Sequence, residues 1–157
     1  MESVVKYEDI VTNMSILGIK KGDTLLMHSA LSSMGRVEGG AQTVIKAFCV
    51  LLGEEGTLVM STLTMWDQPF DVDSTPSAVG VLSEEFRKMP GVKRSLHPVH
   101  SVAAYGKNAA IITADHDKCE TGCGVGTPYV KLCDFDAKVI LLGVDMDRNT
   151  VMHSLEE

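Results

Sequence analysis

Strand-like and helix-like segments alternate along this chain, and that alternation limits the folds the chain can form. Short apolar runs bounded by turn residues predict strands at 24–27, 57–62, 101–105 and 138–144. Segments with a helical spacing of apolar residues separate these runs. Strands that are separated by helices pair in parallel through right-handed crossovers. The sequence therefore predicts a three-layer α/β/α domain with a mostly parallel central sheet.

The helices are predicted from their apolar spacing and from the residues at their ends. A first helix covers 10–17 and stops at Gly18, and a second helix opens at Gly39 and ends at Gly53. Further helices are expected at 78–86, 107–114 and 128–133.

The length and charge of the chain favour a single domain over residues 1–157 and exclude several classes of partner. Its 157 residues carry a formal net charge of −7, without a cluster of lysine and arginine. Binding to nucleic acid or to an anionic membrane surface needs concentrated positive charge, so neither is predicted. No apolar run approaches the ~20 residues that cross a bilayer. The N-terminus has neither a signal-peptide nor a transit-peptide composition, and a cytoplasmic location is expected.

The four cysteines are predicted to be reduced thiols, because disulfides are rare in the cytoplasm. They are Cys49, Cys119, Cys123 and Cys133. A zinc site could be imagined from His116 and the last three cysteines, but no two cysteines have the CxxC spacing typical of such sites. No metal is therefore predicted. A metal-binding or redox module on Cys119 and Cys123 is the weakest functional alternative.

Three segments that contain reactive or hydrogen-bonding side chains follow predicted strands. They are 28–40, 63–77 and 145–153. In sheets of this kind, ligands lie beyond the carboxyl ends of the strands, where helix N-termini point their free backbone amides. We therefore expect the three segments to line one crevice.

The first of these segments has a composition that suits an anion. It contains small hydroxyl residues, three glycines and Arg36 as its only cation. Glycine lets backbone amides approach an anion closely, and the arginine fork can donate two hydrogen bonds to a phosphate at once. The segment has neither the Walker nor the dinucleotide-binding motif. An ordinary turn between a strand and a helix is the competing interpretation.

Three histidines are candidates for chemistry. His97 and His100 precede a predicted strand at a spacing compatible with metal binding, but no third ligand is evident, so a structural role is favoured. His153 follows Thr150, the expected cap of a last helix, by three residues. This spacing puts both side chains on the first turn, facing the crevice. There the helix dipole disfavours the imidazolium and keeps a neutral base available. A capping residue beside a solvated histidine is the alternative.

Four long segments carry a resemblance to a known family. They read MHSALSSMGRVEGGAQTVIKAF, LGEEGTLVMSTLT, TPSAVGVLSEEFRKMPGVKRSLHPVHSVAAYGKNA and KVILLGVDMDRNTVMHSLEE. Together they resemble the aminoglycoside 3-N-acetyltransferase family, which is distinct from the GNAT acetyltransferases. The resemblance implies transfer of an acetyl group from acetyl-coenzyme A to the 3-amino group of an aminoglycoside antibiotic.

The resemblance also implies roles for particular residues. The first loop and the turn at 101–102 are expected to bind acetyl-coenzyme A, while Thr150 and His153 line the reaction centre. The residues expected to bind the cofactor are Ser32, Ser33, Met34, Gly35, Arg36, Val37, Ser101 and Val102.

The chemistry of acetyl transfer is compatible with these residues. An ammonium cannot attack a thioester, so the acceptor amine must lose a proton, and His153 is the predicted general base for a direct attack. Thr150 or backbone amides of the first loop are expected to stabilise the developing charge or protonate the leaving thiolate. An acidic surface would attract a polycationic drug, and Asp67 and Asp145 are predicted to bind it. Acetylation of another amine remains open.

The chain departs from the family pattern in two places. Ala30 stands where many relatives have a second serine, which leaves the backbone amides of the loop intact. Family members also continue well beyond the NTVMH motif. Residues 1–157 are therefore expected to form the N-terminal portion of an incomplete family fold, with a last helix that frays. The alternative function is an inactive remnant that binds coenzyme A, or forms a homo-oligomer through an exposed sheet edge, without catalysis.

Overall fold

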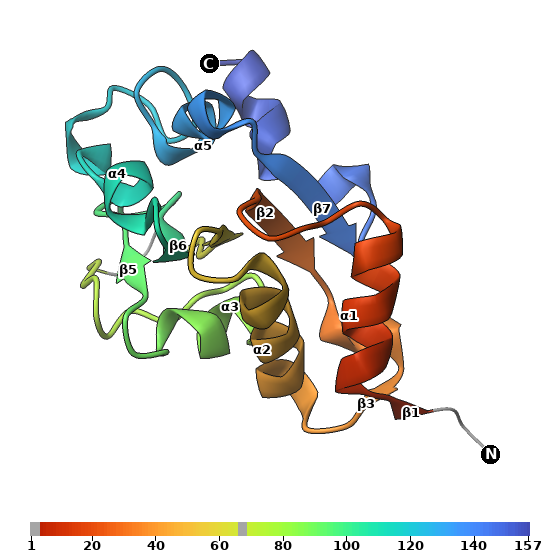
Figure 1. The fold of residues 1–157 in the computed structure, drawn as a ribbon. Coiled ribbons are helices and arrows are strands. Elements are labelled where there is room, and N and C mark those ends of the chain that lie inside the picture. Colours follow the sequence, from red (N-terminus) through yellow and green to blue (C-terminus); the bar gives the residue numbers. More distant parts are fainter. Residues whose placement is uncertain (1–3, 66–68) are drawn as a thin grey trace.

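The chain folds around one central five-stranded sheet, shown in Figure 1 by the computed structural model, which describes residues 4–65 and 69–157. Its strands are β2 (Thr24–Ser29), β4 (Thr57–Ser61), β5 (Lys93–Arg94), β6 (Val102–Gly106) and β7 (Lys138–Leu142). They lie in the order β5-β6-β4-β2-β7. β2 pairs in parallel with both β4 and β7, whereas β6 is antiparallel to β4 and to β5. The predicted parallel direction therefore holds for every strand of this sheet except β6.

Helices cover both faces of the sheet, as predicted for a three-layer α/β/α domain (Figure 1). One face packs against α1 (Tyr7–Ile16), α2 (Gly40–Leu52) and α3 (Val81–Arg87). The other face packs against α4 (Ala109–Thr113), α5 (Pro128–Lys131) and the 3₁₀ helix η3 (Leu132–Phe135). The sheet is thus buried on both sides at its centre.

Strand β2 contributes side chains to the hydrophobic cores on both faces of the sheet. Leu25 and Met27 contact the first layer of helices, and Leu26 contacts the second, because successive side chains of a strand point to opposite faces. The register places Leu26 beside Val59 and Met27 beside Met60 of β4. This register fixes which side chains meet beyond the ends of the two strands.

Glycines set the ends of the longest helix. α2 begins after Gly39, whose φ of 73° is left-handed, and ends before Gly53, with a φ of 68°. Residues with a Cβ adopt such angles at a cost. Both ends lie where the sequence predicts them.

Several short elements were not predicted from the sequence. β1 (Val4–Val5) and β3 (Arg36–Val37) form a separate two-stranded parallel sheet. β5 has two residues, too few for a periodic signal. The 3₁₀ helices η1 (Leu31–Met34), η2 (His116–Lys118) and η4 (Met146–Arg148) were not predicted either, whereas η5 (Thr150–Leu155) lies where the sequence predicts the last helix.

Strand β7 lies at one edge of the five-stranded sheet. Its side chains are exposed or half-buried, and Val139 is 43% exposed. Within the described residues, β2 is the strand with which β7 pairs. The sequence expectation of an exposed edge is compatible with this arrangement, and self-association through it stays a prediction.

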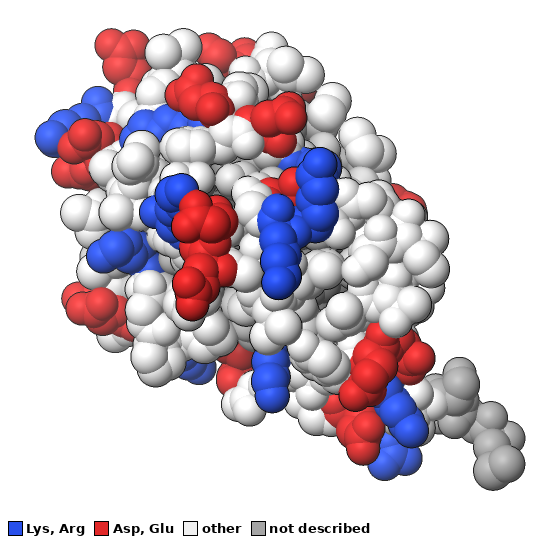
Figure 2. All heavy atoms as spheres, viewed as in Figure 1, with Lys and Arg blue, Asp and Glu red and all other residues white. Residues whose placement is uncertain are grey.

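Acidic and basic side chains are interspersed on the face of the molecule that Figure 2 shows. Some of them are paired, as in the contact of 2.6 Å between Arg87 and Glu84. Among the residues that the structure describes, no helix is both long enough and apolar enough to cross a membrane.

Candidate functional site

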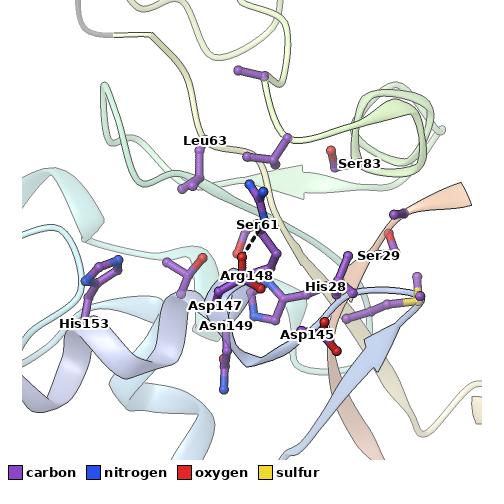
Figure 3. A pocket seen from close by; sticks show the side chains of 17 residues that line it. His28, Ser29, Ser61, Leu63, Ser83, Asp145, Asp147, Arg148, Asn149 and His153 are labelled. Atoms are coloured by element: carbon purple, nitrogen blue, oxygen red, sulfur yellow. Dashed lines mark ion pairs between the residues drawn. The ribbon is translucent and has the colours of Figure 1, made fainter. Parts of the chain in front are cut away.

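The carboxyl ends of β2, β4 and β7 open into one cavity of about 670 Å³ (Figure 3). All three segments that follow these strands contribute to its lining, as the sequence analysis expects. Polar side chains that line it are His28, Ser29, Ser61, Ser83, Asp145, Asp147, Arg148, Asn149, Thr150 and His153. The cavity is therefore the candidate active site.

The segment after β7 forms one wall and contains both predicted catalytic residues. Thr150 is buried, with 7% of its surface exposed, whereas the His153 side chain is 57% exposed. The Nδ1 atom of His153 lies 3.1 Å from a carboxylate oxygen of Glu156. This contact orients the imidazole and leaves Nε2 as the nitrogen available for a proton.

Two details of the sequence prediction are wrong in this wall. Asn149, not Thr150, caps the helix, because the Asn149 side chain accepts a hydrogen bond of 3.2 Å from the backbone amide of Val151. The helix is also a 3₁₀ helix of six residues, and His153 lies in its last turn. The positive end of a helix dipole acts on the first turn. The dipole argument for a neutral His153 therefore does not apply.

The floor of the cavity is formed by the last residues of β2 and β4. His28 is 7% exposed and Ser61 is 5% exposed. Ser61 Oγ accepts a hydrogen bond of 3.1 Å from the hydroxyl of the fully buried Tyr129. Burial lowers the pKa of His28 to about 4, so its imidazole is neutral at pH 7. Sequence reasoning did not single out either floor residue.

We expect the free energy of unfolding to fall as the pH is lowered from about 6.5 toward 4. Burial lowers the pKa of His28 to about 4, and burial is also the main cause of the similar pKa of His116. Between these pH values the unfolded chain binds protons that the folded chain excludes. Each histidine therefore lowers stability by up to about 1.4 kcal/mol per pH unit.

Urea denaturation at a series of pH values checks this expectation. His28→Leu removes one of the two groups, so the slope of unfolding free energy against pH should become shallower. A slope equal to that of the parent protein would show that His28 is not held neutral by burial.

The segment between β4 and α3 forms the opposite wall through Leu63, Ala78 and Val79, and Ser83 of α3 adds to it. Arg94 holds this segment by donating to the backbone carbonyls of Thr62, Val72 and Thr75. Asp67, one of the two predicted substrate-binding residues, lies outside the described residues. Asp145, the other, lines the cavity.

The predicted cofactor-binding residues are divided among four places. Ser33 lies against the cavity wall near Gly143, and Ala30 of the same loop lines the cavity. Arg36 and Val37 line a second hollow of about 380 Å³, together with Lys6 and Gly39. Ser32, Met34 and Gly35 belong to the loop that connects the two.

Ser101 and Val102 are fully buried and do not line the cavity. The Ser101 hydroxyl donates instead to the backbone carbonyl of Thr62 at 2.8 Å. This hydrogen bond joins Ser101 to the segment that follows β4. A part of Ser101 and Val102 in cofactor binding stays a prediction.

Gly143→Ala should destabilise the junction between β7 and the first loop. Gly143 has a φ of +72°, and a Cβ there would lie 2.8 Å from the Cβ of Ser33 and 3.0 Å from the carbonyl oxygen of Ala30. Backbone strain and this clash together should lower the free energy of unfolding by about 2–3 kcal/mol, measured in urea.

Gly22→Ala is the matched control for that experiment. Gly22 has a similar φ of +87°, but nothing lies within 4 Å of a Cβ built there. Its alanine variant should lose only the strain, about 1–2 kcal/mol. An equal decrease in the free energy of unfolding of the two variants would show that the contact with Ser33 contributes nothing to the effect.

The other histidines have structural partners. His97 Nδ1 accepts hydrogen bonds from the backbone amides of Val99 and His100, and its ring stacks on His116 with 4.6 Å between centroids. These contacts agree with the structural role favoured by the sequence. His100 lies closer to the site, with 6.5 Å between its ring centroid and that of His153.

No group of three or more metal-ligating side chains gathers within residues 4–65 and 69–157. The cysteines are free thiols. Burial raises the pKa of Cys49 to about 11 and is the main reason that the pKa of Cys123 is raised to about 12. At neutral pH these two thiols are protonated and therefore poor nucleophiles.

The fold matches that of solved aminoglycoside acetyltransferases. Residues 26–157 match the family model described as aminoglycoside 3-N-acetyltransferase. The chain belongs to the aminoglycoside 3-N-acetyltransferase family.

Three comparisons illustrate the similarity. The SPbeta prophage-derived aminoglycoside N(3')-acetyltransferase-like protein YokD of Bacillus subtilis (strain 168) is 36% identical over 174 residues, which cover 95% of this chain and 64% of YokD. A histidine-to-alanine mutant of AAC(3)-IVa in complex with gentamicin has a TM-score of 0.94 and 33% identity, over 99% of this chain and 61% of that one. The AAC-IIIb binary complex with CoASH has a TM-score of 0.88 and 30% identity, over 98% and 65%. The chain thus spans less than two thirds of each of these proteins.

Proposed function

We propose that this protein transfers the acetyl group of acetyl-coenzyme A to the 3-amino group of an aminoglycoside, with His153 as general base. The observation that carries the proposal is the convergence of His153 and Thr150 on the cavity at the carboxyl ends of β2, β4 and β7. Membership of the family supports the reaction class. A solved relative in complex with CoASH and another with gentamicin support the two substrates.

In the proposed reaction His153 makes the acceptor amine nucleophilic. The amine nitrogen attacks the thioester carbonyl carbon, and His153 Nε2 takes the proton that the nitrogen loses. The hydrogen bond of Nδ1 with Glu156 stabilises the resulting imidazolium. The carbon–sulfur bond then breaks, the proton held on His153 Nε2 passes to the leaving sulfur, and coenzyme A leaves as the thiol while His153 returns to its neutral form. Thr150 lines the same cavity and is suited to donate a hydrogen bond to the developing negative charge.

The two hollows of the structure suit the two ends of coenzyme A. Arg36 and Lys6 line the smaller hollow beside Gly39, where the backbone amides of the α2 N-terminus begin. Glu38 also lines this hollow, so its cations exceed its anion by one charge, and the hollow is suited to the phosphates. The loop through Ser32 and Ser33 leads from there to the cavity that His153 lines.

Acidic side chains at the cavity suit a polycationic acceptor. Asp145 and Asp147 both line it and are exposed to solvent. Asp147 forms an ion pair of 3.2 Å with Arg148, which also lines the cavity, so Asp145 is our proposed contact for an ammonium group of the aminoglycoside. Asp67 is proposed from the sequence alone.

A second candidate function is that of a non-catalytic module that binds coenzyme A or associates with a second copy. The observation that favours it is the edge position of β7 in the five-stranded sheet. An apolar strand edge without a neighbour promotes association. Size-exclusion chromatography with light scattering separates the cases, because a monodisperse monomer contradicts association through β7.

Isothermal titration and an acetylation assay test the proposed function together. We expect saturable binding of coenzyme A to the folded chain and release of free thiol when an aminoglycoside and acetyl-coenzyme A are both present. Binding without thiol release would favour the non-catalytic module. No binding of coenzyme A to folded protein would overturn both functions that involve it.

A further inference from the structure

The floor of the cavity contains a buried nitrogen that lacks a hydrogen-bond partner. His28 Nε2 is buried, and none of the residues that the structure describes forms a hydrogen bond with it. The side chain is 7% exposed and lines the cavity (Figure 3). An unpaired buried polar group destabilises the fold, because it loses the hydrogen bonds that it would make with water. Such a group at the floor of an open cavity indicates that a bound molecule supplies the partner.

Ser61 is a second polar group on the same floor. The parallel register of β2 and β4 pairs Met27 with Met60, so the next residues, His28 and Ser61, lie side by side on one face of the sheet. In the described part of the chain, Ser61 Oγ accepts a hydrogen bond from the Tyr129 hydroxyl. The Ser61 hydroxyl therefore keeps its own proton for another acceptor.

The two groups together suit an uncharged acceptor rather than an ion. Burial keeps the His28 ring neutral, and the hydroxyls of Ser61 and Tyr129 are neutral as well. The charged residues of the cavity, Asp145, Asp147 and Arg148, are exposed at its rim. A carbonyl oxygen can accept two hydrogen bonds, one from a hydroxyl and one from a ring N–H. A cationic amine would instead be drawn to the acidic rim.

We propose that His28 Nε2 and Ser61 Oγ form a donor pair that binds a carbonyl of the acyl-pantetheine arm, an amide or the thioester itself. This inference rests on the proposed function and names the part of the substrate that the floor recognises. In the bound state the ring proton of His28 lies on Nε2 and the hydroxyl proton of Ser61 points to the same carbonyl oxygen. The acceptor amine then enters from the rim, on the side of His153.

The test compares two ligands that share one end. Coenzyme A contains the arm, whereas adenosine 3',5'-bisphosphate has the nucleotide end without it. By isothermal titration, His28→Leu and Ser61→Ala should each weaken the binding of coenzyme A about five- to tenfold, the usual effect of losing one buried hydrogen bond. Neither change should alter the affinity for the bisphosphate. His28→Gln keeps a side-chain N–H donor and should recover most of the affinity.

A stability measurement separates recognition from folding. His28→Leu removes an unpaired polar group from a buried position, so its free energy of unfolding in the absence of ligand should equal or exceed that of the parent protein. A variant that is stable and yet binds coenzyme A less tightly supports the donor pair. Unchanged coenzyme A affinity in both variants would overturn it and leave the proposed function standing. Equal losses for both ligands would also overturn it, because the effect would then not lie in the arm.

Two further outcomes are decisive. If the variants lose affinity for an aminoglycoside and keep it for coenzyme A, the floor belongs to the other substrate and the proposal is wrong. If the parent protein binds neither coenzyme A nor the bisphosphate, the proposed function fails, and the donor pair fails with it.

Discussion

Replacing His153 by alanine should lower the turnover of acetyl-coenzyme A and an aminoglycoside about 10²- to 10⁴-fold, the usual contribution of a general base. His153 lines the cavity, and Glu156 holds its Nδ1 atom at 3.1 Å, so its removal leaves the acceptor amine without a base. The affinity for coenzyme A should change little, because the base acts on the amine. Steady-state kinetics together with isothermal titration measures both quantities.

His100→Ala is the control for that experiment. The centroid of its ring lies 6.5 Å from that of the His153 ring, and His100 is half-buried. Loss of a neighbouring imidazole without a role in proton transfer should change the turnover only a few-fold. If His153→Ala is as active as the parent protein, or no less active than His100→Ala, His153 is not the base.

Glu156→Gln separates the orientation of the imidazole from its basicity. Glutamine preserves the length of the side chain and can still accept a hydrogen bond from Nδ1, but it cannot stabilise an imidazolium by charge. The turnover should fall, but less than in His153→Ala. A turnover equal to that of the parent protein would show that Glu156 does not act through His153.

The second large effect concerns Arg94 and the stability of the cavity wall. Arg94→Met should lower the free energy of unfolding by about 3 kcal/mol or more, because buried carbonyls then lose their donor. In the native chain the guanidinium donates to the carbonyl of Thr62 at 3.0 Å and to that of Val72 at 3.3 Å. It also donates to the hydroxyl of Ser101 at 3.1 Å.

Urea denaturation of Arg94→Met and Arg94→Lys measures this effect. Lysine keeps the charge but cannot reach several acceptors in the fixed geometry of a guanidinium, so it should restore only part of the stability. Limited proteolysis should cut the variants faster in the segment between β4 and α3, because Arg94 holds that segment to the body of the protein. A methionine variant as stable as the parent would contradict this role.

The ordered parts of the fold could be predicted from the sequence because local chemistry determines them. Gly39 and Gly53 end α2 through their backbone freedom, and the apolar runs of β2 and β4 match two buried faces. The two-residue strands could not be predicted, since β1 and β3 contain too few residues for a periodic pattern. The reversed direction of β6 depends on long-range pairing that local patterns do not encode.

The candidate site was predictable in its location and less so in its details. Segments after strands were expected to meet, and Thr150 and His153 do line the cavity together. Both Asn149 and Thr150 are good capping residues, and only the geometry of the chain shows that Asn149 accepts the hydrogen bond. His28 and Ser61 acquire their significance from the register between two strands, which no local motif reveals.

The separation of Arg36 from the cavity likewise depends on tertiary structure. Pairing of β3 with β1 directs Arg36 to the smaller hollow, although it is only a few residues away from Ala30 in sequence. The family resemblance correctly identified the class of protein, whereas the roles of individual loop residues depend on this geometry and stay predictions.

A crystal structure of this chain with coenzyme A would show where the pantetheine arm binds. We expect the arm to enter the cavity at the carboxyl ends of β2, β4 and β7, with its sulfur between the floor residue His28 and the imidazole of His153. Coenzyme A held only at the Arg36 hollow, or an arm that leaves the cavity free of the ligand, would contradict this expectation.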